Sequence, residues 1–183
     1  MSDSHPQTNP SAAPEPIIVV PYDPDWPRQF QREAVAIRAA LGELLLEIEH
    51  VGSTAVPGLE AKLIIDLIAY VPTFEDGFAC VEPLVGLGYE ADGEYGIDGR
   101  HSFRRYPDGV STHHLHKCAR DPAQPRPEVI FRDFLLAHPD AAREYATLKY
   151  TLAARHRHER DVYTEAKTAF INDVLRRASA SES

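Results

Sequence analysis

One carboxylate interrupts the most apolar stretch of the chain. Residues Lys62 to Val71 have the composition of a buried strand, and Asp66 is the one acidic residue among them. Burying a carboxylate without a partner is strongly unfavourable, so Asp66 must be hydrogen-bonded, paired with a cation or bound to a metal. A purely structural alternative is a carboxylate that caps the preceding loop through backbone N–H groups. We favour a functional role because of the residues in that loop.

The loop ahead of the apolar strand contains Gly52-Ser53-Thr54. A Gly-Ser turn alone is common and is typical of an ordinary connection between a strand and a loop. Together with Asp66, the turn predicts a phosphate site. Its backbone N–H groups can approach phosphate oxygens, and a carboxylate on the next strand can hold a divalent metal that aligns the reacting oxygens. Gly52, Ser53 and Thr54 are therefore phosphate-binding candidates, and Asp66 is a catalytic and metal-binding candidate.

Three histidines occur within four residues. In a strand from Ser111 to Cys118, His114 and His116 project from one face and His113 from the other. With Asp66, His114 and His116 would form a two-histidine, one-carboxylate set suited to a divalent transition metal, and either imidazole could act as a general base. The alternative is that both make only solvent and cross-strand contacts. We expect His113 to be structural.

Two pairs of a tyrosine and a lysine occur in the last third of the chain. Tyr145 with Lys149 and Tyr163 with Lys167 are spaced i, i+4, which places each pair on one helix face. A nucleotide could use both features, with a base stacking on the ring and phosphates meeting the ammonium. Singly, each pair is more typical of a half-buried aromatic beside a solvated lysine. Further cationic candidates nearer the sheet are Lys62, Arg100 and Arg104.

Hydrophobic periodicity and turn residues predict strands in the first two thirds of the chain and helices in the last third. Strands are expected at residues 17–20, 44–51, 62–71, 102–106 and 111–118, and residues 107–109 join the last two into a hairpin. Helices are expected at residues 27–41, 74–87, 127–137, 140–157 and 160–178. These elements predict an α+β fold, a small sheet with flanking helices and a C-terminal helical bundle. Residues 1–16 are predicted to be a disordered leader, residues 17–178 one domain, and residues 179–183 a disordered tail.

Composition narrows the class of protein. The 183 residues suit one compact domain, and 28 acidic against 19 basic residues give a net charge of −9. This charge argues against a broad nucleic-acid-binding face. We find neither a signal-peptide pattern nor a membrane-spanning apolar run, so we expect a cytoplasmic protein. Cys80 and Cys118 lack a CxxC spacing, so nothing in the sequence supports a disulfide framework or a cysteine-rich zinc site.

The segment from His50 to Ile68 resembles the GrpB-like family, and the resemblance extends over about residues 17–178. It includes Tyr22, Pro24, Trp26 and Phe30, the stretch Thr112-His113-His114-Leu115-His116, and Tyr145, Leu148, Lys149, Tyr163, Lys167 and Phe170. Members of this family resemble polymerase-β-type nucleotidyltransferases, which implies a nucleotidyltransferase-like small mixed sheet. In that superfamily a Gly-Ser turn precedes a strand with two carboxylates one residue apart. Here the second position is Ile68, which puts standard two-metal transfer in doubt.

The resemblance and the residues together lead to three hypotheses. The first is a protein that binds a nucleotide or phosphate ligand with a divalent metal (Mg, Mn or Zn) and that could transfer a nucleotidyl group. The second is a non-catalytic ligand-binding or accessory module related to coenzyme A metabolism, since GrpB-like domains occur fused to dephospho-coenzyme A kinase. The third is a metal-dependent phosphoester hydrolase centred on Asp66, His114 and His116.

Overall fold

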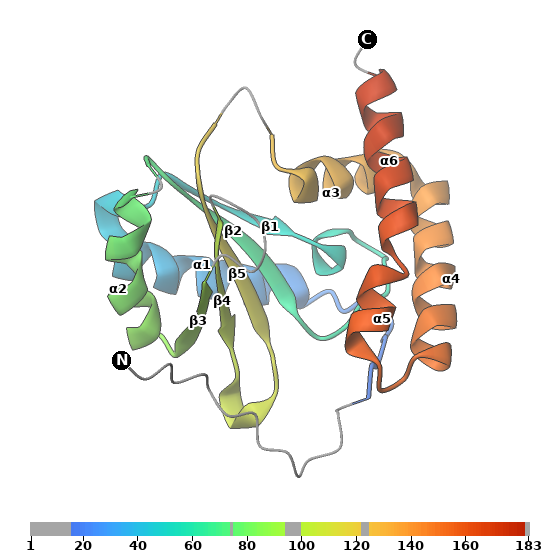
Figure 1. Cartoon of the computed structure of the whole chain (residues 1–183), viewed down its shortest axis with the longest axis horizontal. Helices are drawn as coiled ribbons and strands as arrows, with labels where there is room; N and C mark the ends of the chain where they lie inside the picture. The colour runs from blue at the N-terminus through green and yellow to red at the C-terminus, as the bar shows by residue number, and fades with distance from the viewer. Residues whose placement is uncertain (1–15, 74, 94–99, 122–124, 182–183) are drawn as a thin grey trace, which may run out of the picture.

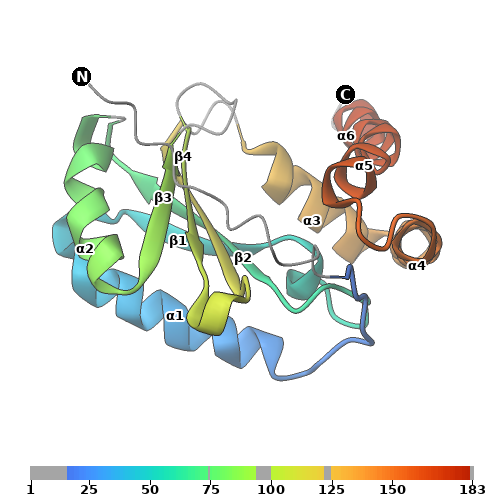
Figure 2. The same cartoon turned by 60° about the horizontal axis from the view of Figure 1, so that its bottom comes forward.

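The computed structural model describes residues 16–73, 75–93, 100–121 and 125–181. Within these residues, the strands form one mixed five-stranded sheet in the order β1-β2-β5-β4-β3. They are β1 (Glu47–Val51), β2 (Ile65–Val71), β3 (Tyr89–Gly93), β4 (Arg100–Arg105) and β5 (His113–Ala119). Helices α1 (Trp26–Leu41) and α2 (Val81–Gly86) cover one side, and α3 (Pro127–Ala137), α4 (Pro139–Arg155), α5 (Arg160–Glu165) and α6 (Thr168–Ser181) gather on the other (Figures 1 and 2). The expected α+β fold, with a small mixed sheet and a C-terminal helical bundle, is confirmed.

The sheet register determines which residues share a face. β2 pairs with β5 in parallel, whereas β1 with β2, β4 with β5 and β3 with β4 are antiparallel. Asp66 lies opposite His114 and Ile68 lies opposite His116 in the β2–β5 pair. Because side chains alternate along a strand, these four residues face the same side of the sheet.

One face of the sheet packs on α1 and α2. The apolar residues of α1 recur at helical spacing, and Pro27 at the helix start suits its fixed φ. They meet the alternate residues of β2 that point away from Asp66. The buried members of this core include Trp26, Phe30, Ala34, Ile37, Leu41, Ile65, Leu67, Ala69, Val71 and Leu84. The core therefore fixes β2 from the side opposite the carboxylate.

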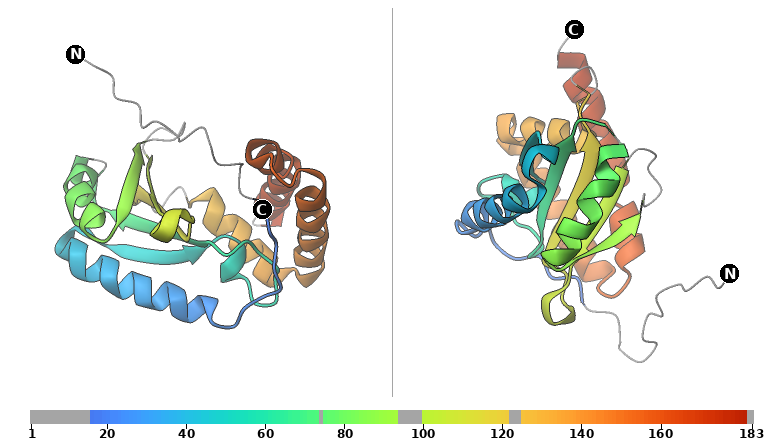
Figure 3. Two further views of the ribbon diagram at one scale, coloured as in Figure 1. Left: turned by 90° about the horizontal axis from the view of Figure 1, so that it is seen from below. Right: turned by 90° about the vertical axis from the view of Figure 1, so that its left-hand side faces the viewer.

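The C-terminal helices form a second core that includes the loop between β1 and β2. Val56 and Leu59 of that loop pack among Phe131, Tyr145 and Val174, which come from α3, α4 and α6. Figure 3 shows α1 running along the sheet, with the C-terminal helices at the end where this loop lies. The loop is thus held between the sheet and the bundle.

Most predicted elements exist, with shifted bounds. The helix predicted at 127–137 matches α3, and those predicted at 27–41 and 140–157 match α1 and α4 to within two residues. The hairpin is confirmed, with Asp108 at φ 55° in its turn. The strands predicted at 44–51 and 62–71 begin later, at Glu47 and Ile65.

Four details of the prediction are wrong. The helix predicted at 160–178 is two helices, α5 and α6, and Lys167 lies between them. The described part of the helix predicted at 74–87 is a 3₁₀ segment, Glu75–Cys80, followed by α2. The run at 17–20 makes only an isolated bridge, between Val20 and Ala61, among the described residues. β3 was not predicted, although Tyr89 and Ala91 alternate with Glu90 and Asp92 over this short stretch.

The predicted leader lies outside the described residues except for Pro16, and residues 182 and 183 of the predicted tail lie outside them too. The α6 helix extends to Ser181. Among the described helices, none combines the length and apolar character needed to cross a membrane.

A buried glutamate ties α1 to the sheet. Glu33 is 8% exposed. The Tyr89 hydroxyl donates to its Oε1 at 2.9 Å, and Arg105 Nη1 donates to its Oε2 at 2.9 Å. His113 Nε2 lies 3.8 Å from the same Oε2, on the face of β5 opposite His114. The expected structural position of His113 agrees with this contact.

We predict that Glu33→Ala lowers the free energy of unfolding by about 2 to 4 kcal/mol, because it leaves a buried hydroxyl and a half-buried guanidinium without their acceptor. Urea unfolding followed by circular dichroism measures the change. The exposed Glu43→Ala is the control and should stay within about 0.5 kcal/mol of the wild type. Equal stabilities of the two variants would contradict the role given to Glu33.

Candidate functional site

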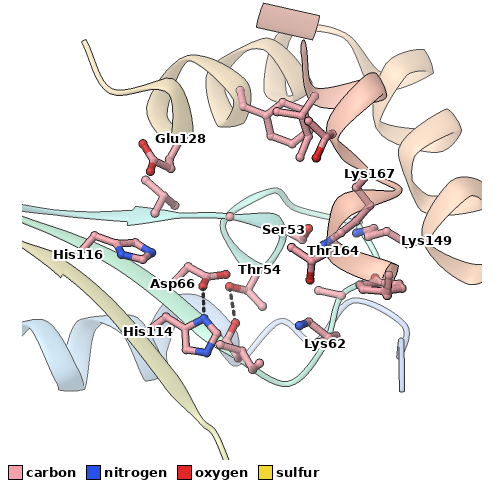
Figure 4. Close-up of a pocket in the computed structure, with 18 of the residues that line it drawn as sticks. Ser53, Thr54, Lys62, Asp66, His114, His116, Glu128, Lys149, Thr164 and Lys167 are labelled. Carbon is pink, nitrogen blue, oxygen red and sulfur yellow. Dashed lines mark hydrogen bonds and ion pairs between the residues drawn. The ribbon is translucent and has the colours of Figure 1, made fainter. Parts of the chain in front are cut away.

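A cleft of about 800 Å³ lies between the Asp66 face of the sheet and the C-terminal helices (Figure 4). Apart from Arg100, whose side chain lies outside the described part of the chain, all the predicted site residues line it. They are Gly52, Ser53, Thr54, Lys62, Asp66, Arg104, His114, His116, Tyr145, Lys149, Tyr163 and Lys167. The structure therefore brings the set together, although the role of each member stays a prediction.

The Gly52 turn lies directly against the Asp66 carboxylate. Gly52 has φ 72°, a conformation that residues with a side chain rarely adopt. A Cβ at this position would lie 2.4 Å from Asp66 Oδ2, which is far closer than van der Waals contact. Glycine is thus required here both by the backbone and by the approach of the carboxylate.

His50 fixes the conformation of the same turn. Its Nε2 lies 3.0 Å from Thr54 Oγ1, and the Thr54 hydroxyl donates to the Ile64 carbonyl at 3.3 Å. Because that hydroxyl proton is already used, His50 Nε2 must carry the hydrogen of the first bond. Burial lowers the pKa of His50 to about 4, so the ring is neutral at physiological pH. The ring also stacks on Phe30 at 4.7 Å, which connects the turn to α1.

Asp66 is held by His114. His114 Nδ1 lies 3.2 Å from Asp66 Oδ1, and His114 Nε2 lies 3.1 Å from Ser111 Oγ. Burial raises the pKa of Asp66, but the hydrogen bond from His114 and the charges of His114, His116 and Lys62 outweigh burial and bring that pKa below its usual value. Asp66 is therefore a carboxylate at physiological pH, and its Oδ1 is engaged with the imidazole.

His116 lies on the same face, with Nδ1 3.2 Å from Ser102 Oγ. Among the residues that the structure describes, no three His, Cys, Asp or Glu side chains are placed to hold a metal ion. The two-histidine, one-carboxylate set is thus present in the cleft but not gathered into a metal site. A Mg²⁺ or Mn²⁺ ion fits the residues better, because such ions need only one or two carboxylates when phosphate oxygens and water complete their shell.

Lys149 extends from α4 into the cleft beside Tyr145. Its Nζ lies 4.7 Å from the centroid of the Tyr145 ring and donates to the Glu60 carbonyl. Lys149 is only 3% exposed. Burial, reinforced by the charge of Lys167, lowers its pKa to about 7. Tyr145 in turn hydrogen-bonds Ser53, so α4 holds the loop at two points.

Two further lysines flank the ring of Tyr163. Lys167 Nζ lies 4.4 Å from its centroid and Lys62 Nζ lies 5.8 Å away. Burial and the charge of Lys62 lower the pKa of Lys167 to about 8. Burial also lowers the pKa of Lys62, and Arg160 and Arg104 add to that effect. The predicted tyrosine and lysine pairs are therefore real contacts, in which both tyrosines and Lys149 are buried and Lys167 is half-buried.

Several lining residues were missed by sequence reasoning. Glu128 and Arg160 line the cleft and were not predicted. The predicted Arg104 also lines it, and its Nε lies 2.8 Å from the Asp92 carboxylate. Glu128 lies in the first turn of α3 and faces the cleft across from His116 (Figure 4). Arg160 was assigned to a long helix, and only the break between α5 and α6 shows that its end of the helix turns toward the sheet. No local sequence signal marks either residue.

The residue at the second carboxylate position is enclosed. Ile68 is 0% exposed and packs with Val51, Tyr70, Cys118 and Val129. It shares the face of Asp66 but lies beneath the side chains of β1, β5 and α3. Of this cluster only Val51 lines the cleft, so Asp66 is the acid that β2 contributes to it.

Comparisons with known proteins place the chain in a family. The family model described as GrpB protein matches residues 16–177. A UPF0157 protein of Pseudomonas aeruginosa is 45% identical over 168 residues, which cover 90% of this chain and 69% of that protein. The glutamate-rich protein GrpB of Alkalihalophilus pseudofirmus is 32% identical, with 87% of this chain and 94% of the relative covered.

A dephospho-CoA kinase of Mycolicibacterium paratuberculosis is 31% identical over 89% of this chain, but the chain spans only 46% of that kinase. Structures of the Cid1 poly(U) polymerase match at TM-scores of 0.44 to 0.47 and 11% to 13% identity, which is too weak a likeness to carry an argument.

A crystal structure of conserved protein GrpB from Enterococcus faecalis superimposes with a TM-score of 0.84 at 38% identity. The match covers 90% of this chain and 99% of that chain. With the family model and these relatives in agreement, the chain belongs to the GrpB family.

Proposed function

We propose that this protein binds a nucleotide or a related phosphate compound in the cleft, together with a divalent cation at Asp66. The observation that carries the proposal is the concentration of lysines. The sequence contains four lysines, and Lys62, Lys149 and Lys167 all line this one cleft. In a chain of net charge −9, such a cluster favours an anion that meets all three ammonium groups.

The remaining groups of the cleft suit the same ligand. The Gly52-Ser53 turn can offer backbone N–H groups to phosphate oxygens. Asp66 would hold a Mg²⁺ or Mn²⁺ ion, with phosphate oxygens as the other ligands. When bound, the cation would neutralise phosphate charge and orient the reacting oxygens. His114 keeps the carboxylate ionised and in place through its hydrogen bond to Oδ1.

Nucleotidyl transfer would use the same groups. Ser53 and the lysines would hold the phosphates, and His116, which faces the Asp66 side of the sheet, would accept a proton from an attacking hydroxyl group. A hydrolase built on Asp66, His114 and His116 requires the three to share a metal, and the described residues do not gather them for that purpose.

A second candidate is a non-catalytic ligand-binding module. The enclosed Ile68 favours it, because this position on the Asp66 face of β2 carries a buried alkyl group where a second carboxylate would bind a second metal. The relatives named as dephospho-CoA kinases suggest an accessory role beside a coenzyme A enzyme. Release of pyrophosphate from nucleoside triphosphates with Mg²⁺ or Mn²⁺ belongs only to the transferase and separates the two candidates.

We predict that Asp66→Asn removes the effect of Mg²⁺ on ligand binding. In the wild type, Mg²⁺ should tighten ADP binding by about tenfold or more, since the cation bridges carboxylate and phosphate. The variant keeps the acceptor for His114 but loses the charge. Isothermal titration calorimetry with and without Mg²⁺ measures the difference. Asp133→Asn, on an exposed side chain of α3, is the control. A variant titration that matches the wild type in both conditions would remove Asp66 from the site.

We predict that Gly52→Ala disables the site and that Gly58→Ala does not. Both glycines have positive φ, 72° and 80°, so both substitutions strain the backbone by about 1 to 2 kcal/mol. Only the Cβ at position 52 meets Asp66, whereas nothing lies within 4 Å of the Cβ at position 58. ADP binding should therefore fall by about tenfold or more in Gly52→Ala alone. Equal losses of affinity in the two variants would mean that strain, not the contact with Asp66, is responsible.

We predict that phosphate binding weakens as the pH rises. In the free protein Lys149 and Lys167 lose their protons near pH 7 and 8, and a bound anion raises both pKa values again. Binding above pH 7 therefore takes up protons, and the affinity falls by at most about tenfold per pH unit for each proton taken up. Calorimetry with ADP from about pH 7 to pH 9 should give a shallower slope for Lys149→Met than for the wild type. Identical slopes would show that Lys149 does not titrate with the ligand.

A further inference from the structure

We propose that the cleft recognises its ligand through a chain of phosphates and not through a nucleobase. The ligand class is then any compound with two or more adjacent phosphate groups, whichever base it carries and even without one. This inference rests on the proposed function and adds to it the part of the ligand that determines affinity.

The aromatic rings that line the cleft are closed to a ligand. Among the described lining residues these rings belong to Phe103, Phe131, Tyr145 and Tyr163, and the residues are 1%, 8%, 5% and 1% exposed. Stacking of a base needs an open ring face, and it is the main source of affinity for bases that are bound without sequence readout. Neither tyrosine offers such a face.

The contacts of the two tyrosines explain why. The Tyr145 ring stacks on Phe170, with centroids 5.1 Å apart and planes at 18°, and Lys149 approaches it at 4.7 Å. The Tyr163 ring is approached by Lys167 and Lys62. The rings therefore stabilise the ammonium groups by cation–π contact and hold them in the cleft. The expected stacking of a base on these rings has no room in this arrangement.

The cations of the cleft are spread over several elements rather than gathered at one point. Lys149 comes from α4, Arg160 from α5 and Lys62 from the loop before β2, and Lys62 and Lys167 approach the same Tyr163 ring. The charge of Lys167 also lowers the pKa of Lys149, and that of Lys62 lowers the pKa of Lys167, so these neighbouring cations repel one another. A chain of phosphates can reach them in succession and neutralise each one.

The other rings of the cleft are the imidazoles of His114 and His116. They are held through hydrogen bonds to Ser111 and Ser102, and His114 is also held by Asp66. The fourth lysine, Lys117, is 0% exposed and lies on the α1 side of the sheet, because it shares the face of Leu115. The three lysines that can meet an anion thus lie in this cleft.

The test is calorimetric titration of the full chain, with Mg²⁺ in excess, against inorganic tripolyphosphate, ATP, GTP, CTP, UTP and adenosine. We expect tripolyphosphate and the four triphosphates to bind with dissociation constants within about threefold of one another, well under the tenfold or more that a stacked base would add. Adenosine should not bind measurably.

Two other outcomes are distinguishable. If one triphosphate binds more than about tenfold tighter than tripolyphosphate, the inference is wrong while the proposed function stands. If neither tripolyphosphate nor any triphosphate binds, the proposed function itself is overturned.

A variant gives an independent readout. Lys167→Met should weaken tripolyphosphate and ATP by the same factor, of about tenfold, because both ligands use the same ammonium. Arg28→Met, whose side chain is 81% exposed on α1, controls for the loss of a positive charge. The inference would be contradicted if Lys167→Met lost ATP binding but still bound tripolyphosphate. Circular dichroism checks that both variants fold.

Discussion

The close approach of the Asp66 carboxylate to the Gly52 turn is the constraint on which the cleft depends. Asp66 can lie there because residue 52 has no Cβ and because the turn accepts a positive φ. Each partner is fixed from outside the cleft. The α1 core holds β2 from the opposite face, and His50 holds Thr54 from β1. The carboxylate and the turn therefore have fixed positions before a ligand arrives, which reduces the ordering that binding must do.

The lysine cluster lowers the free energy of unfolding of the ligand-free protein. Lys149 and Lys167 have pKa values of about 7 and 8 in the folded chain, below the ordinary value of 10.5. From about pH 7 to pH 10.5 the unfolded chain binds more protons than the folded chain. The free energy of unfolding therefore rises with pH across this range and is lowest at its neutral end. An anion bound in the cleft raises the pKa of both lysines, so the folded chain keeps these protons. Groups that weaken a fold while they gather in one cavity are typical of a binding site, since packing alone gives no reason to bury three amines together.

Local patterns in the sequence were enough to predict α1, α3 and α4, the hairpin and the common face of Asp66, His114 and His116, because each depends on periodicity or turn residues within a short stretch of chain. They were also enough to pair Tyr145 with Lys149. Local patterns do not determine which elements pack against one another. The break at Lys167 has no Pro or Gly to mark it, and Glu128 reaches the cleft only because α3 crosses the strand end. The exposure of the tyrosines was misjudged for the same reason, since a neighbour such as Phe170 comes from another helix.

The enclosed Ile68 leaves Asp66 as the one acid that β2 presents to the cleft, and this limits the number of metal ions the site can hold. Two-metal transfer depends on carboxylates that hold both cations against their mutual repulsion. Here one acid of β2 faces the turn while its neighbour two residues on supports Val51 and Cys118. Lys149 and Lys167 come from the helical side of the cleft and can neutralise phosphate charge directly, as arginine and lysine do in other phosphate sites. A ligand bound in this way needs at most one metal, so strong binding of phosphates and weak or absent turnover are compatible in the same arrangement.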